Sequence, residues 1–260
     1  MRLRRSPHFC YGVGGRKDHV RMGTLIIIRH GQASFHDEDY DRLSPLGEEQ
    51  ARRLGAYWAG HGVRFDRALT GPLRRQRRSA EIVRDEFENA GQPFPEIEVD
   101  AALAEMPIES LAKRFLPQLC ADDPVSLDLI NRFASATDKL EKERLFQKAF
   151  EKLLLKWAAR EYHDPEIETF DDFVGRVKDS IGGITARSTN GQRVAAFTSG
   201  GPTAVAVHLA LGTTFEATLE LVWQVRNASL TEFMFTEGRF TLSTFNNVAH
   251  LREPELWTYR

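Results

Sequence analysis

Short apolar runs alternate along the chain with segments whose apolar residues recur at helical spacing. A short run of apolar and β-branched residues bounded by turn residues is typical of a buried strand. Three such runs predict strands over residues 24–29, 65–70 and 194–198. Helical segments follow them over about 45–59, from 71 onward and over about 203–211. This alternation predicts an α/β fold with three layers, α/β/α, around a mainly parallel central sheet.

Local signals mark where two helices and the last strands begin. Ser44 is a favourable cap for a helix whose first position is Pro45. The pair Gly71-Pro72 opens the next helix. Residues 229–235 and 239–245 alternate between apolar and polar positions, which predicts a hairpin.

Residues 106–165 depart from the strand–helix alternation. Three segments in this block have helical patterns, at 111–119, 125–133 and 139–162. A helical block inserted between the strands of a sheet is most simply a cap over a functional site. The alternative is a helical side layer without a role in substrate choice. We expect one domain over residues 23–260, with a helical cap insertion at about 106–165.

Bulk properties exclude several classes of protein. A net charge of −2 gives no sign of nucleic-acid binding, and no apolar run approaches the roughly 20 residues that span a bilayer. Cys10 and Cys120 provide no disulfide framework, which favours a reducing compartment and a cytoplasmic location. Residues 1–22 lack hydrophobic periodicity. They are predicted to be a leader outside the domain, either a disordered tail or an artefact of expression or of the start site.

The first predicted strand ends in Arg29-His30-Gly31. In α/β sheets, ligands bind at the carboxyl ends of the strands. There an imidazole can attack an anionic substrate while a guanidinium neutralises and orients it. The structural alternative is a buried arginine in an ion pair, next to a histidine that only ends the strand.

Two further turns follow predicted strands in the same way. Residues 70–80 carry four arginines at the start of a helix, where backbone N–H groups favour an anion. Thr198-Ser199-Gly200-Gly201-Pro202 combines glycines, which allow close backbone approach, with a proline suited to a helix start. Three such turns that converge at one sheet edge predict a site for a phosphoryl group.

These segments together resemble the histidine phosphatase (phosphoglycerate mutase-like) superfamily. The resemblance covers about residues 25–251 in matching order and includes a helical insertion where the family carries its variable cap. The motifs that carry it are Arg29-His30-Gly31, Leu43-Ser44-Pro45-Leu46-Gly47-Glu48-Glu49-Gln50-Ala51, and Thr70-Gly71-Pro72-Leu73-Arg74-Arg75 with Ser79-Ala80.

The resemblance implies roles for individual residues. His30 is similar to the nucleophile that becomes phosphorylated, and Arg29 and Arg75 are similar to the phosphate clamps. The resemblance also implies that Gln32 lies at the rim of the phosphate-binding pocket. Glu105 stands where the proton donor is expected, with Glu109 as the nearest rival and an exposed surface carboxylate as the structural alternative.

Two positions depart from the family pattern. The family usually has a second catalytic histidine where this chain has Ser199, followed by Gly200 in the phosphate cradle. His36 stands where many members have a phosphate-contacting asparagine. One hypothesis is that His36 swings in and partly restores the missing imidazole; the alternative is an exposed loop histidine. His208 is a poorer substitute, and we assign His250 a structural role.

The resemblance leaves the reaction open between mutases and phosphatases. The stretch 33–41 lacks the tryptophan-containing segments of the mutases, which favours a phosphomonoesterase acting on a phosphorylated small molecule through a phosphohistidine. We expect no cofactor and no metal, because the acidic loop 37–41 lacks regular ligand spacing. The sequence leaves open whether the protein forms a homodimer. The alternatives are a phosphotransferase of the mutase type, a catalytically weak phospho-ligand-binding relative and, less favoured, a serine hydrolase that uses Ser199.

Overall fold

A computed structural model describes residues 21–34, 41–187 and 191–259. The leader prediction and the His36 hypothesis fall largely or wholly outside these residues. One six-stranded sheet organises the described part, in the order β3-β2-β4-β1-β5-β6. Its strands are β1 (Gly23–Arg29), β2 (Arg67–Thr70), β3 (Ile97–Val99), β4 (Arg193–Thr198), β5 (Leu230–Thr236) and β6 (Arg239–Asn247).

The sheet is mainly parallel, which confirms the predicted fold class. β1 and β2 both run parallel to β4, and β2 runs parallel to β3. The predicted hairpin of β5 and β6 adds the antiparallel edge, because β5 pairs antiparallel with both β1 and β6. β1 and β4 therefore lie side by side at the centre, and both end at the same edge of the sheet.

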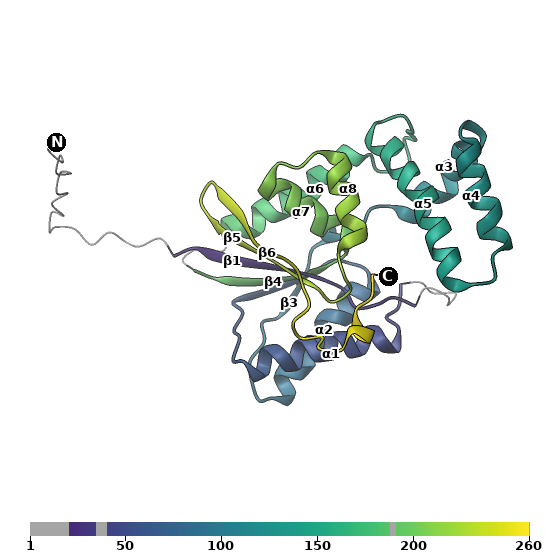
Figure 1. Cartoon of the computed structure of the whole chain (residues 1–260). Helices are drawn as coiled ribbons and strands as arrows, with labels where there is room; N and C mark the ends of the chain where they lie inside the picture. Colours follow the sequence, from purple (N-terminus) through teal and green to yellow (C-terminus); the bar gives the residue numbers. More distant parts are fainter. Residues whose placement is uncertain (1–20, 35–40, 188–190, 260) are drawn as a thin grey trace, which may run out of the picture.

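Helices cover both faces of the sheet (Figure 1). One face carries α1 (Pro45–Gly60) and α2 (Arg74–Asn89), and the other carries α6 (Phe170–Arg187) and α7 (Gly200–Leu211), with α8 (Phe215–Gln224) against α7. Short 3-10 turns lie at η1 (Ala101–Leu103) and η2 (Pro254–Leu256). No helix among the described residues is long and apolar enough to cross a membrane.

The two faces are separated by the alternation of side chains along β1. Leu25 and Ile27 pack into the core beneath α6 and α7, whereas Ile26 and Ile28 pack with Leu54 of α1 and residues of α2. Successive side chains of a strand point to opposite faces. The residues at the end of β1, Arg29 and His30, are therefore directed to opposite sides of the sheet edge.

The predicted helical block is present between β3 and β4 in the sequence. It consists of α3 (Ile108–Asp122), α4 (Pro124–Ser135) and α5 (Lys139–Ala158). The block stands beside the sheet, beyond the end at which β1 terminates (Figure 1). Leu129, Leu145 and Ala149 form a small core of its own.

Several boundaries differ from the sequence prediction for local reasons. α2 begins at Arg74 and not at Gly71, because Leu73 is still extended, and α7 begins at Gly200 and not near 203. α5 ends at Ala158 and not at 162, shortly before Arg160 takes a φ of 60°. Elements that were not predicted are β3, α6 and α8.

Two glycines let the β1 turn approach α1. A Cβ on Gly31 would lie 2.2 Å from the backbone oxygen of Gly47, and a Cβ on Gly47 would lie 2.1 Å from that of Gln32. Both clashes would be with backbone atoms, which cannot move aside as the end of a flexible side chain can. The motif glycines therefore set how closely the turn after the strand packs on the helix.

Gly47→Ala is expected to lower the free energy of unfolding by about 1–3 kcal/mol, since overpacking against backbone forces a shift. Gly60→Ala at the end of the same helix is the matched control, because its Cβ would meet nothing within 4 Å. The control should be neutral or stabilising by up to about 1 kcal/mol. Urea denaturation measures both variants, and equal stabilities would contradict the packing argument.

Candidate active site

His30 follows the last residue of β1, and its backbone N–H donates to the Thr198 carbonyl at the end of β4 (2.8 Å). The side chain is only 4% exposed. Its ring Nδ1 lies 2.6 Å from the Gly31 carbonyl, and Arg75 Nε lies 3.1 Å from its Nε2. The guanidinium can only donate, so Nε2 accepts and the proton sits on Nδ1. The ring is held as a neutral imidazole.

The charges around His30 favour this neutral form. Burial lowers the pKa of His30 well below its usual range, and the cations of Arg75 and Arg29 lower it further, while the Gly31 carbonyl acts in the opposite direction. A neutral imidazole at ordinary pH keeps a lone pair available for attack on an electrophile.

Arg75 reaches the imidazole from the first turn of α2 and is itself oriented by Asp41. Its Nη1 lies 2.7 Å from Asp41 Oδ1, and the backbone N–H of Arg74 donates to Asp41 Oδ2 (2.8 Å). The Asp41 carboxylate therefore stands at the N terminus of α2, where the helix dipole and free N–H groups favour an anion. The N terminus of α2, where the sequence predicts an anion, therefore holds the carboxylate of Asp41.

Arg29 lies near His30 on the other face of the sheet, at the end of β1. Its Nη1 donates to the Val225 carbonyl after α8. A Cβ on Gly200 would lie 3.8 Å from the Arg29 guanidinium carbon, so the glycine backbone passes close to this cation. Arg29, His30, Arg75 and Gly200 all line one cavity of about 290 Å³.

Ser199 lies at the N-cap of α7 and is completely buried. Its Oγ accepts a hydrogen bond from Gln76 Nε2 (2.8 Å). It is not among the residues that line the cavity. No hydrogen bond between the described histidines and this hydroxyl is present, so no base activates it.

Glu105 lines the cavity from the turn after η1. Its carboxylate accepts hydrogen bonds from the backbone N–H groups of Met106 (2.9 Å) and Gly201 (3.1 Å). The second contact places the carboxylate at the N terminus of α7, where the helix dipole favours negative charge. A Cβ at Gly201 would lie 2.1 Å from Glu105 Oε1, so a larger residue there would displace the carboxylate from its present position.

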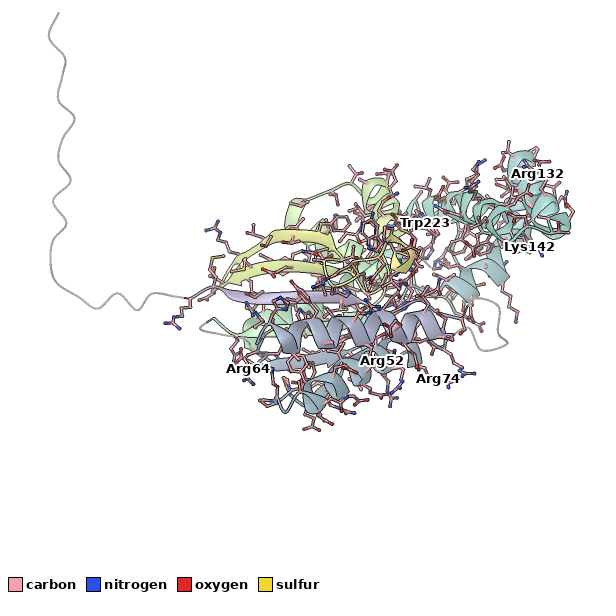
Figure 2. The ribbon with its side chains drawn as sticks, turned by 60° about the horizontal axis from the view of Figure 1, so that its bottom comes forward. Arg52, Arg64, Arg74, Arg132, Lys142 and Trp223 are labelled. Carbon is pink, nitrogen blue, oxygen red and sulfur yellow. The ribbon has the colours of Figure 1, made fainter. Side chains whose placement is uncertain are left out.

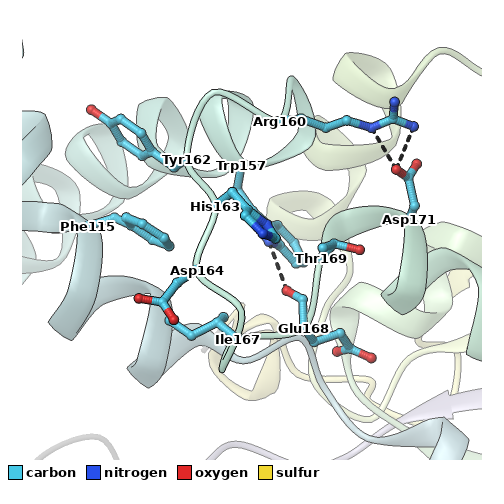
Figure 3. Close-up of a pocket in the computed structure, with 10 residues that line it drawn as sticks. All are labelled: Phe115, Trp157, Arg160, Tyr162, His163, Asp164, Ile167, Glu168, Thr169 and Asp171. Atoms are coloured by element: carbon cyan, nitrogen blue, oxygen red, sulfur yellow. Dashed lines mark hydrogen bonds and ion pairs between the residues drawn. The ribbon is translucent and has the colours of Figure 1, made fainter.

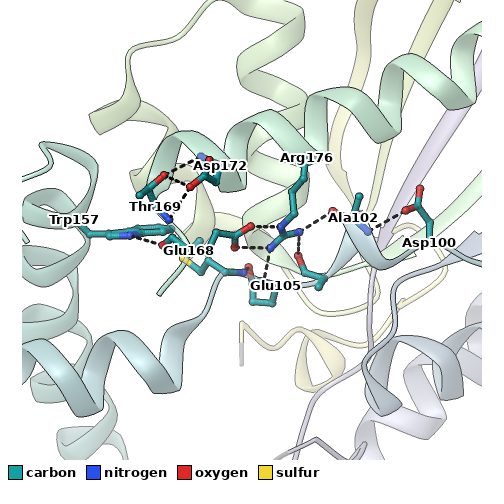
Figure 4. A network of polar contacts seen from close by, with 10 residues as sticks. Asp100, Ala102, Glu105, Trp157, Glu168, Thr169, Asp172 and Arg176 are labelled. Carbon is teal, nitrogen blue, oxygen red and sulfur yellow. Dashed lines mark hydrogen bonds and ion pairs between the residues drawn. The ribbon is translucent and has the colours of Figure 1, made fainter. Parts of the chain in front are cut away.

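Arg176 of α6 fixes the turn that carries Glu105 (Figure 4). Its guanidinium donates to the carbonyls of Ala102 (2.7 Å), Ala104 (2.8 Å) and Glu105 (3.1 Å), and pairs with both oxygens of Glu168. The remaining carbonyl of the turn, that of Leu103, accepts from Thr198 Oγ1 (2.6 Å) and Gln76 Nε2 (3.1 Å). Every carbonyl from 102 to 105 is therefore bonded.

The rest of the cavity wall is mainly apolar and comes from several elements. Among its residues, α5 supplies Phe146 and Phe150, α8 supplies Trp223, and the C-terminal segment supplies Tyr259; Met106, and Ile108 at the start of α3, also line the cavity. Phe150 and Trp223 form an edge-to-face pair with ring centroids 6.3 Å apart, which joins the helical block to α8.

The other predicted residues lie in different surroundings. The Gln32 side-chain oxygen accepts from Ser44 Oγ (2.8 Å) at the start of α1, outside the cavity lining. His208 Nδ1 lies 2.8 Å from the Thr213 carbonyl, also outside it. Glu109 lines the cavity but is exposed. His250 is buried in the turn after β6, and burial lowers its pKa to about 4.

A second cavity, of about 450 Å³, lies between the helical block and the start of α6 (Figure 3). Its Arg160 pairs with Asp171, and the Trp157 indole donates to the Glu168 carbonyl (3.1 Å). His163 also lines this cavity, but its side chain is exposed. The combination of a buried imidazole and two guanidinium groups belongs to the first cavity.

Sequence reasoning missed the residues that support the site. Asp41 was considered only as part of the acidic loop 37–41, and Gln76 was given no role. Arg176 and Glu168 lie in a stretch without a motif. The available signal for the cavity wall was the spacing of Phe146 and Phe150, which puts two aromatic rings on one face of a helix.

Both buried histidines should make stability depend on pH. Their pKa values are lowered in the folded state, so the unfolded chain binds more protons below about pH 6.5 and the free energy of unfolding falls. Each should contribute a loss of about 1 kcal/mol between pH 6.5 and pH 5.5. Urea denaturation of wild type and His30→Gln tests this. An unchanged pH dependence in the variant would contradict a lowered pKa for His30.

Comparison with known proteins gives two kinds of likeness. The sequence profile of the histidine phosphatase superfamily (branch 1) matches residues 25–143 and 128–248. A 2,3-bisphosphoglycerate-dependent phosphoglycerate mutase of Rhizobium rhizogenes is 36% identical over 92 residues, which cover 32% of this chain and 41% of that protein. A broad-specificity phosphatase of Saccharomyces cerevisiae is 31% identical over 83 residues, 30% of this chain and 34% of that protein.

These curated relatives are matched over less than half of their length. Among solved structures, a phosphoglycerate mutase from Bacillus anthracis matches with a TM-score of 0.59 and 19% identity, covering 89% of this chain and 96% of that one. A mycobacterial glucosyl-3-phosphoglycerate phosphatase with inorganic phosphate matches with a TM-score of 0.56 and 20% identity, covering 88% and 99%. At these identities the likeness is one of fold. With its profile matched over most of its length, the chain belongs to the histidine phosphatase superfamily, whose phosphatases and mutases are enzymes of phosphoryl transfer.

Proposed function

We propose that this protein is a metal-independent phosphomonoesterase that works through a phosphohistidine on His30. The observation that carries the proposal is the buried neutral imidazole whose Nε2 lies 3.1 Å from Arg75 Nε, in a cavity that Arg29 also lines. Guanidinium groups bind phosphoryl oxygens with their forked N–H donors. The proposed nucleophile, His30, and two groups suited to bind an anion, Arg29 and Arg75, therefore line one cavity.

In the first step, the phosphoryl oxygens take over the N–H donors of Arg75 and Arg29. This frees the lone pair on His30 Nε2, which forms a bond to phosphorus as the bond from phosphorus to the ester oxygen breaks. The electron pair of that bond leaves with the alkoxide. Glu105, which has to carry a proton when the ester binds, gives that proton to the alkoxide. The Gly31 carbonyl holds the Nδ1 proton and stabilises the positive charge that develops on the ring.

In the second step, water attacks the phosphorus of phosphohistidine. Glu105, now a carboxylate, takes a proton from that water, and the electron pair of the nitrogen–phosphorus bond returns to His30 Nε2. Inorganic phosphate leaves and the neutral imidazole is restored. The same carboxyl group serves as acid and then as base, as microscopic reversibility of the two displacements requires.

In this proposal, Ser199 lowers the turnover rate but does not change the type of reaction. A hydroxyl in place of the family's second histidine brings no positive charge to the transition state, and here it is bonded to Gln76. Loss of one such group typically lowers turnover by about 10²–10³-fold. A slow enzyme is therefore expected, which keeps a phospho-ligand-binding role as the second candidate function.

The first test is a rate measurement with a phosphomonoester while a chelator is present throughout. His30→Ala should abolish hydrolysis, because no other described histidine lines the cavity. Ser199→Ala should change the rate less than about tenfold, since removing the hydroxyl costs one neutral hydrogen bond. His208→Ala, outside the cavity, is the control and should match wild type.

Three results would count against the proposal. Activity in His30→Ala together with an inactive Ser199→Ala would favour a serine hydrolase. Loss of activity with the chelator would favour a metal-dependent reaction. Tight phosphate binding by wild type without any turnover would favour the binding role.

A second prediction concerns Glu105 and the residue that positions it. Glu105→Gln should lower kcat/KM for an alkyl phosphate by about 10²-fold or more, and far less for nitrophenyl phosphate, whose leaving group needs little protonation. Arg176→Met should give the same dependence on the leaving group, because it releases the carbonyls of the turn. Lys178→Met, exposed on the same helix, is the control. Equal losses for both esters would assign Arg176 to stability alone.

A further inference from the structure

The cavity that contains His30 is lined by a few charged groups and by a larger number of apolar side chains. Its cations, Arg29 and Arg75, both lie near the imidazole. Apolar side chains from α3, α5 and α8 line the same cavity, and they are Ile108, Phe146, Phe150, Leu154 and Trp223. An ester whose phosphoryl group binds at His30 would therefore extend its alcohol part along hydrocarbon.

No third cation among the described residues lines this cavity. Arg74, Arg132 and Lys142 lie elsewhere on the surface of the molecule (Figure 2). The remaining charged groups of the lining are the carboxylates of Glu105 and Glu109. A carboxylate or a second phosphate on the alcohol part would meet no further cation among the described residues and one or two like charges. An unpaired charge buried against hydrocarbon is strongly disfavoured.

The half-buried aromatic side chains are available to a ligand. Phe146 and Trp223 are both partly exposed, whereas Phe150 and Leu154 behind them are about 1% exposed. The volume of about 290 Å³ is at the lower end of the range for small-molecule sites, which is roughly 300–1,000 Å³. It suits one phosphoryl group with a single ring or a short alkyl chain.

We propose that the substrates are phosphomonoesters of apolar alcohols, aryl or short-chain alkyl, without a second anionic group. This inference rests on the proposed phosphatase function and names its substrate class. It also disfavours the mutase alternative, because a phosphoglycerate carries a carboxylate for which this cavity offers no cation among the described residues.

The test compares n-hexyl phosphate with the same alkyl phosphate that ends in a carboxylate. The two leaving alkoxides are alike, so kcat/KM reports the fit of the alcohol part. We expect at least a tenfold preference for the uncharged chain, about the discrimination that one small group gives in an apolar pocket. Equal kcat/KM values, or a preference for the carboxylate, would overturn the inference.

Phe146→Lys adds the missing cation to the apolar wall and should reverse the preference or reduce it by about tenfold. Leu140→Ala, on the same helix and 61% exposed, is the matched control and should keep the wild-type ratio. Thermal unfolding of both variants identifies a general loss of fold. A folded Phe146→Lys with an unchanged ratio would show that the chain does not lie along α5.

The outcomes also separate this inference from the proposed function. Hydrolysis of both esters at equal rates, lost in His30→Ala, would reject the substrate class and leave the phosphatase standing. If neither ester is hydrolysed, calorimetry with n-hexylphosphonate and its carboxylate-terminated analogue still measures the preference of the cavity. Tighter binding of the uncharged phosphonate would support the inference, and equal or weaker binding would reject it.

Discussion

The contact between the Arg75 guanidinium and His30 Nε2 is the interaction on which the site depends. It requires an unprotonated Nε2, and a fixed cation 3.1 Å away keeps it so. Burial acts in the same direction on the pKa, and the Gly31 carbonyl holds the proton on the other nitrogen. In the proposed mechanism, the unprotonated nucleophile therefore lies next to the group that binds the phosphoryl oxygens.

The fold delivers this contact through backbone geometry. Alternation along β1 sends Arg29 toward α8 and His30 toward α2, so the two arginines reach the cavity from opposite faces of the sheet. β4 ends beside β1, and α7 follows it directly. The N terminus of α7 donates a backbone hydrogen bond to the Glu105 carboxylate. Arg176 connects that carboxylate's turn to Glu168, near the end of the helical block, so the block and the candidate acid share one polar network.

The sequence was sufficient for the features that depend on short-range pattern. Apolar runs located β1, β2 and β4, and Ser44 and Pro45 located the start of α1. The family resemblance then placed Glu105 in the cavity with His30. β3 was missed because it is three residues long, and α6 because its glycines weaken a helical pattern.

Features that depend on distant residues could not be found in this way. Asp41 pairs with Arg75 across 34 positions, and Arg176 meets the Glu105 turn across 71 or more. Neither pair has a spacing that a local pattern could reveal. The apolar wall likewise combines α5, α8 and the C-terminal segment, which meet only in the folded chain.

The central claim is that His30 carries the phosphoryl group during turnover. The most direct measurement is phosphorus-31 NMR of the enzyme quenched in base during hydrolysis of a phosphomonoester, followed by mapping of the modified peptide. The account predicts an acid-labile phosphoryl group on Nε2 of His30 that is absent in His30→Ala. A phosphoryl group on another residue, or turnover without any phosphoenzyme in rapid-quench samples, would contradict it.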